Sequence, residues 1–515
     1  MPIPQEKISA ILASGFLCAS VFAGPVQDNH GLTDLIARLG DGNEPTGAGI
    51  EVAQVEATQT NGYAPDVDHA EFAGKTFTFV SGTSGVSNHA TNVGKRMYGT
   101  GNSGIAPGTD TIYLYAAIGW AQADFLKVGT GSNPSSPPGN VAIFNNSWIG
   151  SFGSTPLDTE TLCRADWSVD TSNAMMLCGV ANTGAHQPLL SFGFNGVSVG
   201  TTDGSHLGGQ VPSGYASSGM QIPLIVAEQG TTSNATGVVS GITAMIVETA
   251  ETHPNTSGDY FATMSETTKA VLLAGGNHEA DWTNNPETTG PDRGRTDQPI
   301  DAMVGVGTAN IDRSWQVMAG GKHNSSTSTG GLTPAPYAGW ETSTITNNQS
   351  RYILFDVNTP ADEVSIVLTW HQTPRNDFSS YIEVDLDLQL WKFEGGSLVS
   401  LTGDAGLGVF SEGNVVSESL VDTVEHLYIQ DLAIGEYVLE VTRKNSSASS
   451  RAFSVGWLFP EPADLPGDIN GDGILDVEDL LMILSAWGLC SGCEEDLTGD
   501  GTVDVTDLLQ FLSYW

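Results

Sequence analysis

Four polar residues in the N-terminal half of this 515-residue chain are of types that together perform nucleophilic chemistry. They are Glu56, His89, Asn182 and Ser233. A serine hydroxyl is a weak nucleophile unless a histidine takes its proton, and a carboxylate must hold that imidazole in one tautomer. An asparagine amide can donate a hydrogen bond to the oxyanion that develops during acyl transfer. If the fold brings these side chains together, acyl transfer is the chemistry they predict.

Each of these residues, taken alone, also fits an ordinary structural role. Ser233 fits a helix cap, and Asn182 fits a turn residue. His89 fits a hydrogen-bonded core residue, and Glu56 fits a surface carboxylate. Their order along the chain and the segments that surround them favour the joint interpretation.

Each candidate stands at the end of an apolar segment or at the start of a predicted helix. The strand within GAGIEVAQVEA ends at Glu56, and the buried strand AMMLCGV runs into a glycine turn at Asn182. His89 opens a predicted helix, and Ser233 stands at the mouth of another. Apolar strands that alternate with helices predict an α/β fold, a parallel sheet with helices on both faces. The carboxyl ends of such strands share one crevice, where Glu56, Asn182 and Ser233 are expected.

The same segments resemble motifs of the subtilisin family of serine proteases, over roughly Gly47 to Ala319. The stretch His89-Ala-Thr-Asn-Val-Gly is similar to the family's His-Gly-Thr-His-Val-Ala motif. Val180-Ala-Asn-Thr-Gly resembles its Ala-Gly-Asn segment, and Thr231-Thr-Ser-Asn-Ala-Thr resembles its Gly-Thr-Ser-Met-Ala-Thr motif. The resemblance implies a subtilisin-like catalytic domain that hydrolyses peptide bonds in polypeptide substrates.

The resemblance also implies a role for each residue. Ser233 is the nucleophile, His89 is the general base and then the general acid, and Asn182 is the oxyanion donor. The strand edge at VAIFNNSWIG is expected to pair with the substrate backbone. Its substrate-binding residues are Ser147, Trp148 and Gly150.

One departure from the family pattern concerns the carboxylate. This chain has Glu56 where the family has Asp, and the extra methylene displaces the carboxylate. Since a displacement of about 1 Å can cost about 100-fold in rate, the change bears on activity. Asp66 and Asp68 are alternative partners for His89, although both lie beyond the strand. A catalytically inactive, subtilisin-like binding or scaffold protein is therefore the alternative function.

The C-terminal tail contains a duplicated segment, DINGDGILDVEDLLMILSAW and then DLTGDGTVDVTDLLQFLSYW. Each copy has oxygen-bearing side chains at loop positions 1, 3, 5, 9 and 12 and glycine at position 6, as an EF-hand-type calcium loop requires. The predicted ligands, including a backbone carbonyl at position 7, are Asp468, Asn470, Asp472, Ile474, Asp476 and Asp479, then Asp496, Thr498, Asp500, Thr502, Asp504 and Asp507. The pattern resembles dockerin domains, which implies two bound Ca²⁺ ions and a cohesin-like docking partner.

The net charge and the N-terminus indicate an exported protein. A formal net charge of −41 argues against nucleic-acid partners and anionic membranes. Lys7 precedes an apolar run from Ile8 to Phe22, and Val21-Phe22-Ala23 offers a cleavage site. We therefore expect a signal peptide over residues 1–23, no transmembrane anchor after its removal, and a secreted or cell-surface location.

The cysteines fit an oxidising compartment, because an even number remains after the signal peptide. They are Cys163, Cys178, Cys490 and Cys493. Proximity in sequence predicts one disulfide between the first two and another between the last two. A zinc site is the alternative for the second pair.

Composition divides the remaining chain into four parts. A catalytic domain over 24–320 is followed by a Gly/Ser/Thr/Pro-rich linker over 321–345. Short alternating segments over 346–460 predict an antiparallel β-sandwich similar to jelly-roll-like accessory domains, and 461–515 form a small α-helical, EF-hand-like (dockerin-like) domain. In YIEVDLDLQLW, alternation creates a polar face that is either solvated or a calcium site. Its residues are Glu383, Asp385, Asp387 and Gln389.

Overall fold

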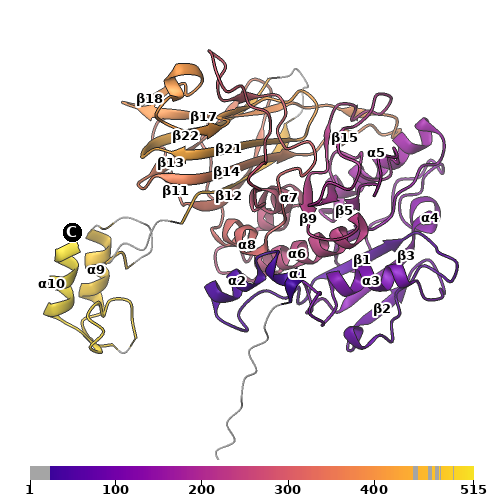
Figure 1. Cartoon of the computed structure of the whole chain (residues 1–515), viewed down its shortest axis with the longest axis horizontal. Helices are drawn as coiled ribbons and strands as arrows, with labels where there is room; N and C mark the ends of the chain where they lie inside the picture. The colour runs from indigo at the N-terminus through magenta and orange to yellow at the C-terminus, as the bar shows by residue number, and fades with distance from the viewer. Residues whose placement is uncertain are drawn as a thin grey trace, which may run out of the picture.

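The computed structural model describes residues 24–444, 450–461, 467–469, 475, 477–490 and 492–514. The expected signal peptide lies outside these residues. The described chain forms a unit built on a parallel sheet, a unit built on two further sheets and a pair of C-terminal helices (Figure 1). Among its helices, none is both long enough and apolar enough to cross a membrane.

The first unit contains a seven-stranded sheet in the order β2-β3-β1-β4-β5-β6-β9. Every neighbouring pair of strands in it is parallel. The strands are β1 (Glu51–Glu56), β2 (Thr76–Phe79), β3 (Thr111–Ala116), β4 (Val141–Asn146), β5 (Met175–Gly179), β6 (Val197–Thr201) and β9 (Ile225–Ala227). Alternate residues of a strand enter different apolar cores, as Val52 and Ala53 do. The predicted α/β architecture with a parallel central sheet is confirmed.

Helices cover both faces of this sheet. The long helix α6 (Thr232–Thr252) is almost wholly buried, because its residues are mostly small or β-branched. It packs against α3 (Asn88–Met97) and against β4, β5 and β6. On the opposite face, α5 (Thr155–Ser172) contributes Leu162 and Cys163 to the second core. The other helices of this unit are α1 (Pro25–Asp28), α2 (Leu32–Leu39), α4 (Ala117–Gly119), α7 (Ser265–Ala274) and α8 (Ile311–Ala319).

The second unit contains two sheets with one shared apolar core, to which β13 contributes Ile353 and β14 contributes Val364. One sheet has the order β12-β23-β14-β21-β19, and the other has the order β10-β20-β17-β22-β13-β11 with β18 beside β17. The strands are β10 (Arg295–Thr296), β11 (Pro334–Ala335), β12 (Ala338–Ile345), β13 (Ser350–Val357), β14 (Ala361–Trp370), β17 (Leu386–Glu394), β18 (Ser397–Val399), β19 (Glu412–Gly413), β20 (Val416–Ser417), β21 (Val424–Leu432), β22 (Gly435–Arg443) and β23 (Arg451–Leu458).

The boundary between the two units differs from the predicted linker over 321–345. Strand β12 begins at Ala338 and pairs with β23 along its whole length, and Trp340 within it is fully buried. Strand β10 belongs to the sequence expected to lie in the catalytic domain, yet it pairs with β20. Polar composition indicated a linker here because the hydroxyl-rich strand has few apolar residues to mark it.

The polar face predicted in YIEVDLDLQLW is not solvated throughout. Asp387 is buried and its carboxylate pairs with the Lys444 ammonium, so a side-chain cation stands where calcium was considered. Burial and the nearby Asp387 carboxylate raise the pKa of Asp385 to about 6.

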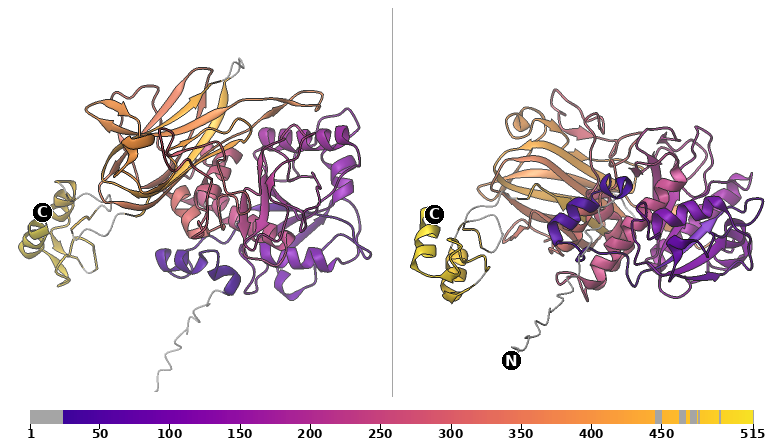
Figure 2. Two further views of the ribbon diagram at one scale, coloured as in Figure 1. Left: turned by 45° about the horizontal axis from the view of Figure 1, so that its top comes forward. Right: turned by 60° about the horizontal axis from the view of Figure 1, so that its bottom comes forward.

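Helix α7 lies between the two units, as the views in Figures 1 and 2 agree. It packs against β14 and β23 of the second unit. The contact is partly polar: Thr267 Oγ1 lies 2.6 Å from Thr342 Oγ1, and Thr369 Oγ1 donates to the Glu266 carbonyl at 2.9 Å. The two units therefore share a buried, hydrogen-bonded interface.

The C-terminal segment has a small core of its own, formed by Ile469, Ile483, Val503 and Phe511. Its elements are α9 (Val477–Ser485), α10 (Val505–Tyr514) and the strand pair β24 (Gly488–Leu489) and β25 (Thr502–Val503). The two helices contact each other.

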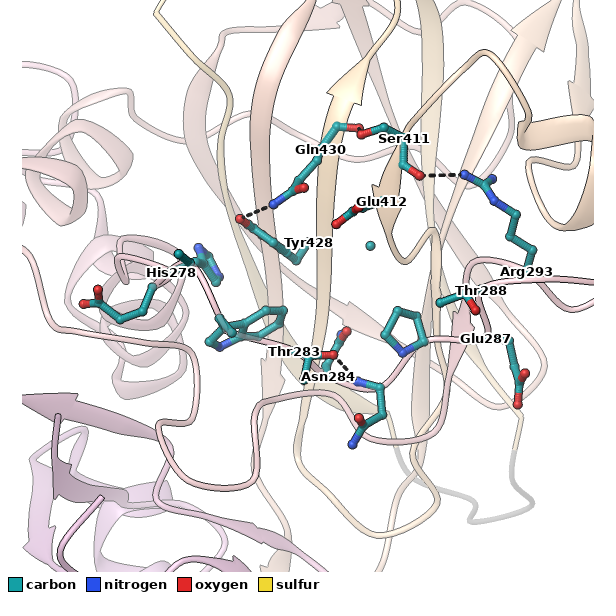
Figure 3. A pocket seen from close by; sticks show the side chains of 16 residues that line it. His278, Thr283, Asn284, Glu287, Thr288, Arg293, Ser411, Glu412, Tyr428 and Gln430 are labelled. Atoms are coloured by element: carbon teal, nitrogen blue, oxygen red, sulfur yellow. Dashed lines mark hydrogen bonds between the residues drawn. The ribbon is translucent and has the colours of Figure 1, made fainter. Parts of the chain in front are cut away.

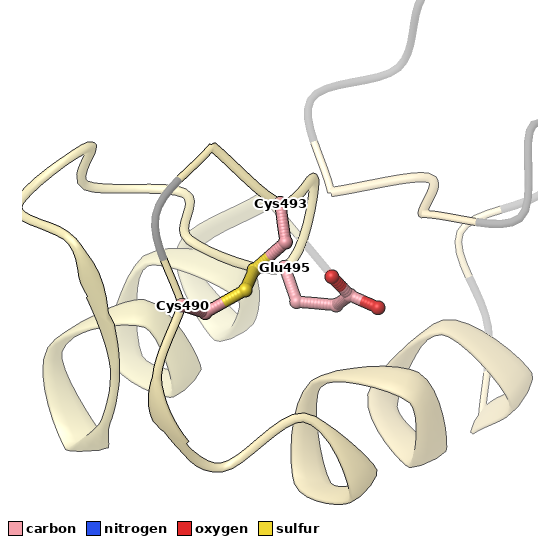
Figure 4. A group of neighbouring side chains, drawn as sticks. All are labelled: Cys490, Cys493 and Glu495. Atoms are coloured by element: carbon pink, nitrogen blue, oxygen red, sulfur yellow. A yellow bond between two sulfur atoms is a disulfide. The ribbon is translucent and has the colours of Figure 1, made fainter.

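One of the two predicted disulfides is confirmed and the other is wrong. Cys490 and Cys493 form a disulfide beside Glu495 (Figure 4), so their sulfurs are not available as a zinc site. Cys163 and Cys178 are free and buried. They lie on α5 and β5 and pack into the same apolar core, where each acts as a small apolar side chain.

Candidate active site

The end of β1 and the start of α3 bring a carboxylate and an imidazole together. Glu56 is the last residue of β1 and is 1% exposed. His89 lies in the first turn of α3, which Ser87 caps by accepting from the Ala90 N–H. The His89 Nδ1 atom lies 2.8 Å from Glu56 Oε2. The extra methylene of Glu56 is thus accommodated, and Glu56 is the partner of His89 rather than Asp66 or Asp68.

A hydrogen-bonded chain behind Glu56 holds its carboxylate in place. Gln54 Nε2 donates to Glu56 Oε1 at 2.8 Å and to the Ala90 carbonyl at 2.8 Å. The buried Tyr98 hydroxyl donates to Gln54 Oε1 at 2.5 Å. Sequence reasoning missed Gln54 and Tyr98, although Gln54 stands two residues before Glu56 and must therefore share its face of β1.

The charge of Glu56 acts on His89. The hydrogen bond to Glu56 and its negative charge raise the pKa of His89, while partial burial of the ring opposes this shift. Because the raised pKa favours the imidazolium, the pair is suited to stabilise the charge that a general base acquires when it takes a proton.

The start of α6 positions the candidate nucleophile. Thr231 caps this helix by accepting from the Asn234 N–H, and Ser233 follows in the first turn. The Ser233 hydroxyl donates to the Ser147 carbonyl at 3.3 Å, and the Ser147 hydroxyl donates back to the Ser233 carbonyl at 3.0 Å. The N–H groups of a first helical turn have no intrahelical acceptors, so this end of α6 favours negative charge.

Asn182 is oriented by the same helix start. Its Oδ1 atom accepts from the Thr232 N–H at 2.8 Å and from the Thr232 hydroxyl at 3.1 Å. Because these two donors require an acceptor, the oxygen of the amide is fixed on α6. The Nδ2 group is therefore the end of Asn182 that can donate to a ligand.

A pocket of about 210 Å³ joins these groups. His89, Asn182 and Ser233 line it, together with Ser147, Trp148 and Ile149. Thus the structure brings three of the four predicted catalytic side chains to one cavity, and the fourth, Glu56, is buried behind His89.

The predicted substrate-binding edge is placed only in part at this pocket. Ser147 and Trp148 line it. The exposed Ile149, which follows Trp148, lines it too and was missed by sequence reasoning. Gly150 does not line it: its carbonyl accepts from the Leu189 N–H at 3.1 Å, so this part of the edge is already paired within the chain.

A larger pocket, of about 530 Å³, lies elsewhere. It is bounded by the loop after α7 and by the edge strand β19, and Figure 3 shows Tyr428, Gln430 and Arg293 around it. None of the predicted catalytic residues lines this pocket. The predicted catalytic residues thus line the smaller of these two pockets.

Several of the predicted calcium ligands fall within the described residues, and others do not. Asn470, Asp472, Ile474 and Asp476 lie outside them, while Asp468 and Asp479 and the whole second loop lie inside. In the second loop, Asp496 Oδ2 accepts from the Gly501 N–H at 2.7 Å, and Asp507 Oδ1 accepts from the Thr498 N–H at 2.9 Å. The carboxylates of this loop are not among the groups of three that the described residues bring within metal-binding distance of one another.

The buried Asp507 favours its charged form. Burial alone would raise the pKa of its carboxyl, but the N–H groups of Asp504 and Thr498 donate to it and hold the pKa below its usual range. The residue types of the second loop fit a hard cation, because they supply many oxygens and a charged position 12.

Comparison of the chain with protein-family models and with curated proteins gave no match in either case. Among solved structures, it is similar to a serine protease of Aeromonas sobria, at 15% identity over 80% of this chain and 89% of that chain, with a TM-score of 0.33. A protease from Pseudoalteromonas arctica matches at 15% identity over 57% and 95%, with a TM-score of 0.33. The PatG macrocyclase in complex with peptide matches at 16% identity over 58% and 99%, with a TM-score of 0.36. We therefore infer the function from the geometry of the site.

Proposed function

We propose that this chain is a secreted serine-type endopeptidase that hydrolyses peptide bonds through Ser233, His89 and Glu56. The observation that supports this most strongly is the 2.8 Å contact between His89 Nδ1 and the buried Glu56 carboxylate, beside a pocket that also contains Ser233 and Asn182. The ordinary role considered for Glu56, a surface carboxylate, does not fit its burial.

In the proposed acylation step, the Ser233 Oγ atom attacks the carbonyl carbon of the scissile peptide. His89 Nε2 takes the hydroxyl proton while Nδ1–H donates to Glu56, which stabilises the imidazolium. The oxyanion that forms accepts from Asn182 Nδ2 and from the first turn of α6. The C–N bond then breaks, and His89 gives its proton to the leaving amine.

Deacylation repeats these steps with water. His89 takes a proton from water, the resulting hydroxide attacks the acyl-enzyme carbonyl, and Ser233 recovers its proton as the acid leaves. For the first step the Ser233 hydroxyl must rotate from the Ser147 carbonyl toward His89. The long 3.3 Å hydrogen bond to Ser147 offers little resistance to that rotation.

The test uses a fluorophosphonate probe, from which an activated serine oxygen displaces fluoride. We expect labelling at Ser233, located by mass spectrometry, and none in Ser233→Ala. The exposed Ser213 supplies the matched control, since Ser213→Ala should label at the rate of the unaltered protein. In Glu56→Asp the carboxylate is withdrawn from His89 by one methylene, so labelling should slow by about 100-fold for a displacement of about 1 Å.

The same experiment decides the alternative function, an inactive subtilisin-like binding or scaffold protein. Absence of labelling in chain that circular dichroism shows to be folded would refute the peptidase proposal and favour that alternative. Cleavage of an unstructured polypeptide such as casein, lost in Ser233→Ala, would extend the result from an activated serine to an endopeptidase.

We further propose that the tail binds two Ca²⁺ ions and docks to a cohesin-like partner. The duplicated loop sequence and the oxygen-rich second loop support this. The second loop's carboxylates now accept backbone N–H groups, so binding would require Asp496 and Asp507 to redirect their oxygens toward the ion. Calorimetric titration of the full chain should give two ions, and Asp496→Asn should give one; two ions in both would refute this assignment.

A further inference from the structure

Three ligand-type side chains from three separate segments meet between the two sheet units. Asp170 lies in the last turn of α5, Glu266 lies in the first turn of α7, and His371 directly follows β14. One ligand atom from each lies within 4.8 Å of the other two. The group shares no residue with the catalytic candidates.

His371 is the unusual member of this group. Its side chain is fully buried, and within the part of the chain that the structure describes neither ring nitrogen has a hydrogen-bond partner. Leaving a buried polar atom unpaired costs about 1–3 kcal/mol, so such atoms in native proteins call for an explanation. Its Nδ1 atom lies near an oxygen of both carboxylates.

The distances fit metal ligands better than hydrogen bonds. His371 Nδ1 lies 3.4 Å from Asp170 Oδ1 and 3.4 Å from Glu266 Oε1. A charge-assisted hydrogen bond would bring nitrogen and oxygen to about 2.7–2.9 Å. Ligands about 2.1 Å from a tetrahedral ion are separated from one another by about 3.4 Å. The distance from His371 Nδ1 to each carboxylate oxygen therefore equals the distance expected between two ligands of one ion.

We propose that Asp170, Glu266 and His371 bind a divalent transition-metal ion, with zinc as the best match. One imidazole and two carboxylates suit zinc and its neighbours, whereas calcium prefers oxygen ligands throughout. The two carboxylates neutralise the ion in a buried place. Asp170, whose side chain is 24% exposed, forms the open side through which the ion and a water ligand enter.

Two cations lie near the group, Lys269 and Arg451. The charge of Glu266 acts on Lys269, but the Lys269 ammonium donates to the Phe194 carbonyl at 2.8 Å. The charges of Asp170 and Glu266 act on Arg451, but among the described residues Arg451 forms no ion pair with either carboxylate. Its Nη1 atom donates instead to the Thr373 hydroxyl. Arg451 therefore offsets the negative charge without pairing with either carboxylate.

The position gives this ion a structural function. Asp170 and Glu266 belong to the parallel-sheet unit, and His371 belongs to the two-sheet unit. Around them the units are joined by neutral hydrogen bonds, for example from the Gln372 N–H to Asn195 Oδ1 at 2.9 Å. The ion clamps the two units together, and it does so whether or not the chain is a peptidase.

The test measures zinc binding to the full chain after removal of metals with a chelator and dialysis. We expect about one Zn²⁺ per chain by calorimetry and by elemental analysis, and a rise in Tm of a few degrees on adding zinc. Both should be lost in His371→Gln and in Asp170→Asn. Asparagine has nearly the same shape as aspartate, and position 170 lies at the exposed side of the group. Asp170→Asn therefore stays informative if His371→Gln does not fold.

The matched control is Asp496→Asn in the C-terminal loop, which should keep the zinc stoichiometry and the Tm response. Zinc bound equally by folded Asp170→Asn and by the unaltered chain would overturn the proposal, because the ion would then lie elsewhere. Absence of zinc binding to the unaltered chain would overturn it as well. Neither readout depends on activity at Ser233.

Discussion

Replacement of Glu56 by glutamine tests how the carboxylate controls His89. The glutamine side chain has the same length, so it keeps its place at the end of β1 while losing its charge. Gln54 Nε2 donates to the Oε1 position at 2.8 Å, so the new amide must present its oxygen to Gln54. Its NH₂ group then faces His89 Nδ1, at the position of Glu56 Oε2, which lies 2.8 Å from Nδ1 in the unaltered chain.

That orientation forces the wrong tautomer on the imidazole. Nδ1 must accept from the new NH₂ group, so the ring proton moves to Nε2, the nitrogen that has to take the proton of Ser233. The equivalent amide substitution in a Ser-His-Asp triad costs about 10⁴-fold in kcat. We expect Glu56→Gln to lose about 10³- to 10⁴-fold in kcat/KM, which corresponds to about 4–5.5 kcal/mol at about 1.36 kcal/mol per factor of ten.

The assay is hydrolysis of a chromogenic peptide, with fluorophosphonate labelling of Ser233 as a second readout. Glu51→Gln is the matched control, because Glu51 begins the same strand and accepts from the Asn140 N–H, which the amide oxygen can still do. Adding Gln54→Met to Glu56→Gln lets the amide turn over and should restore part of the lost rate. A Glu56→Gln enzyme within about tenfold of the unaltered rate would refute the assigned role of the carboxylate.

Three further predictions concern the oxyanion donor, the pH profile and the tail. Asn182→Asp keeps the oxygen acceptor that Thr232 needs but removes the Nδ2 donor. The kcat should therefore fall by about 10²–10³-fold with little change in Tm. An active variant would exclude Asn182 as the oxyanion donor. Because Glu56 raises the pKa of His89 and only the neutral ring is a base, kcat/KM should rise with pH through a midpoint above 6.5, and an acid limb below that value would contradict the pairing. Calcium removal should alter the circular dichroism of the tail without changing Ser233 labelling, because the tail has its own core; slower labelling in chelator would show that the units are coupled.

The sequence allowed the positions of the catalytic candidates to be predicted because each one follows a strong local pattern. Buried apolar strands bounded by glycine turns are recognisable without tertiary information, and parallel strands must end on one side of a sheet. Glu56 ends one such strand, Asn182 follows another, and Ser233 lies at the start of a helix of small residues. Their convergence on one crevice followed from topology alone.

What could not be predicted depends on contacts between distant segments. Tyr98 lies in contact with Gln54 only because α3 packs over β1, and no local pattern announces that hydrogen bond. Cys163 and Cys178 are close in sequence, yet they stay free because each is held by the packing of its own helix or strand. The cluster of Asp170, Glu266 and His371 forms only when the two units meet.

The energetics of the Glu56–His89 pair favour the proposed peptidase over the alternative function. Placing an ionised carboxylate at 1% exposure is costly, and a buried ion pair generally adds little net stability over apolar residues of similar size. A binding or scaffold protein gains nothing from that cost at this strand end. A general base does gain, because the fixed charge selects its tautomer and stabilises its protonated form. In the proposed mechanism, the Tyr98–Gln54–Glu56 chain holds a charge that stabilises His89 when it accepts a proton.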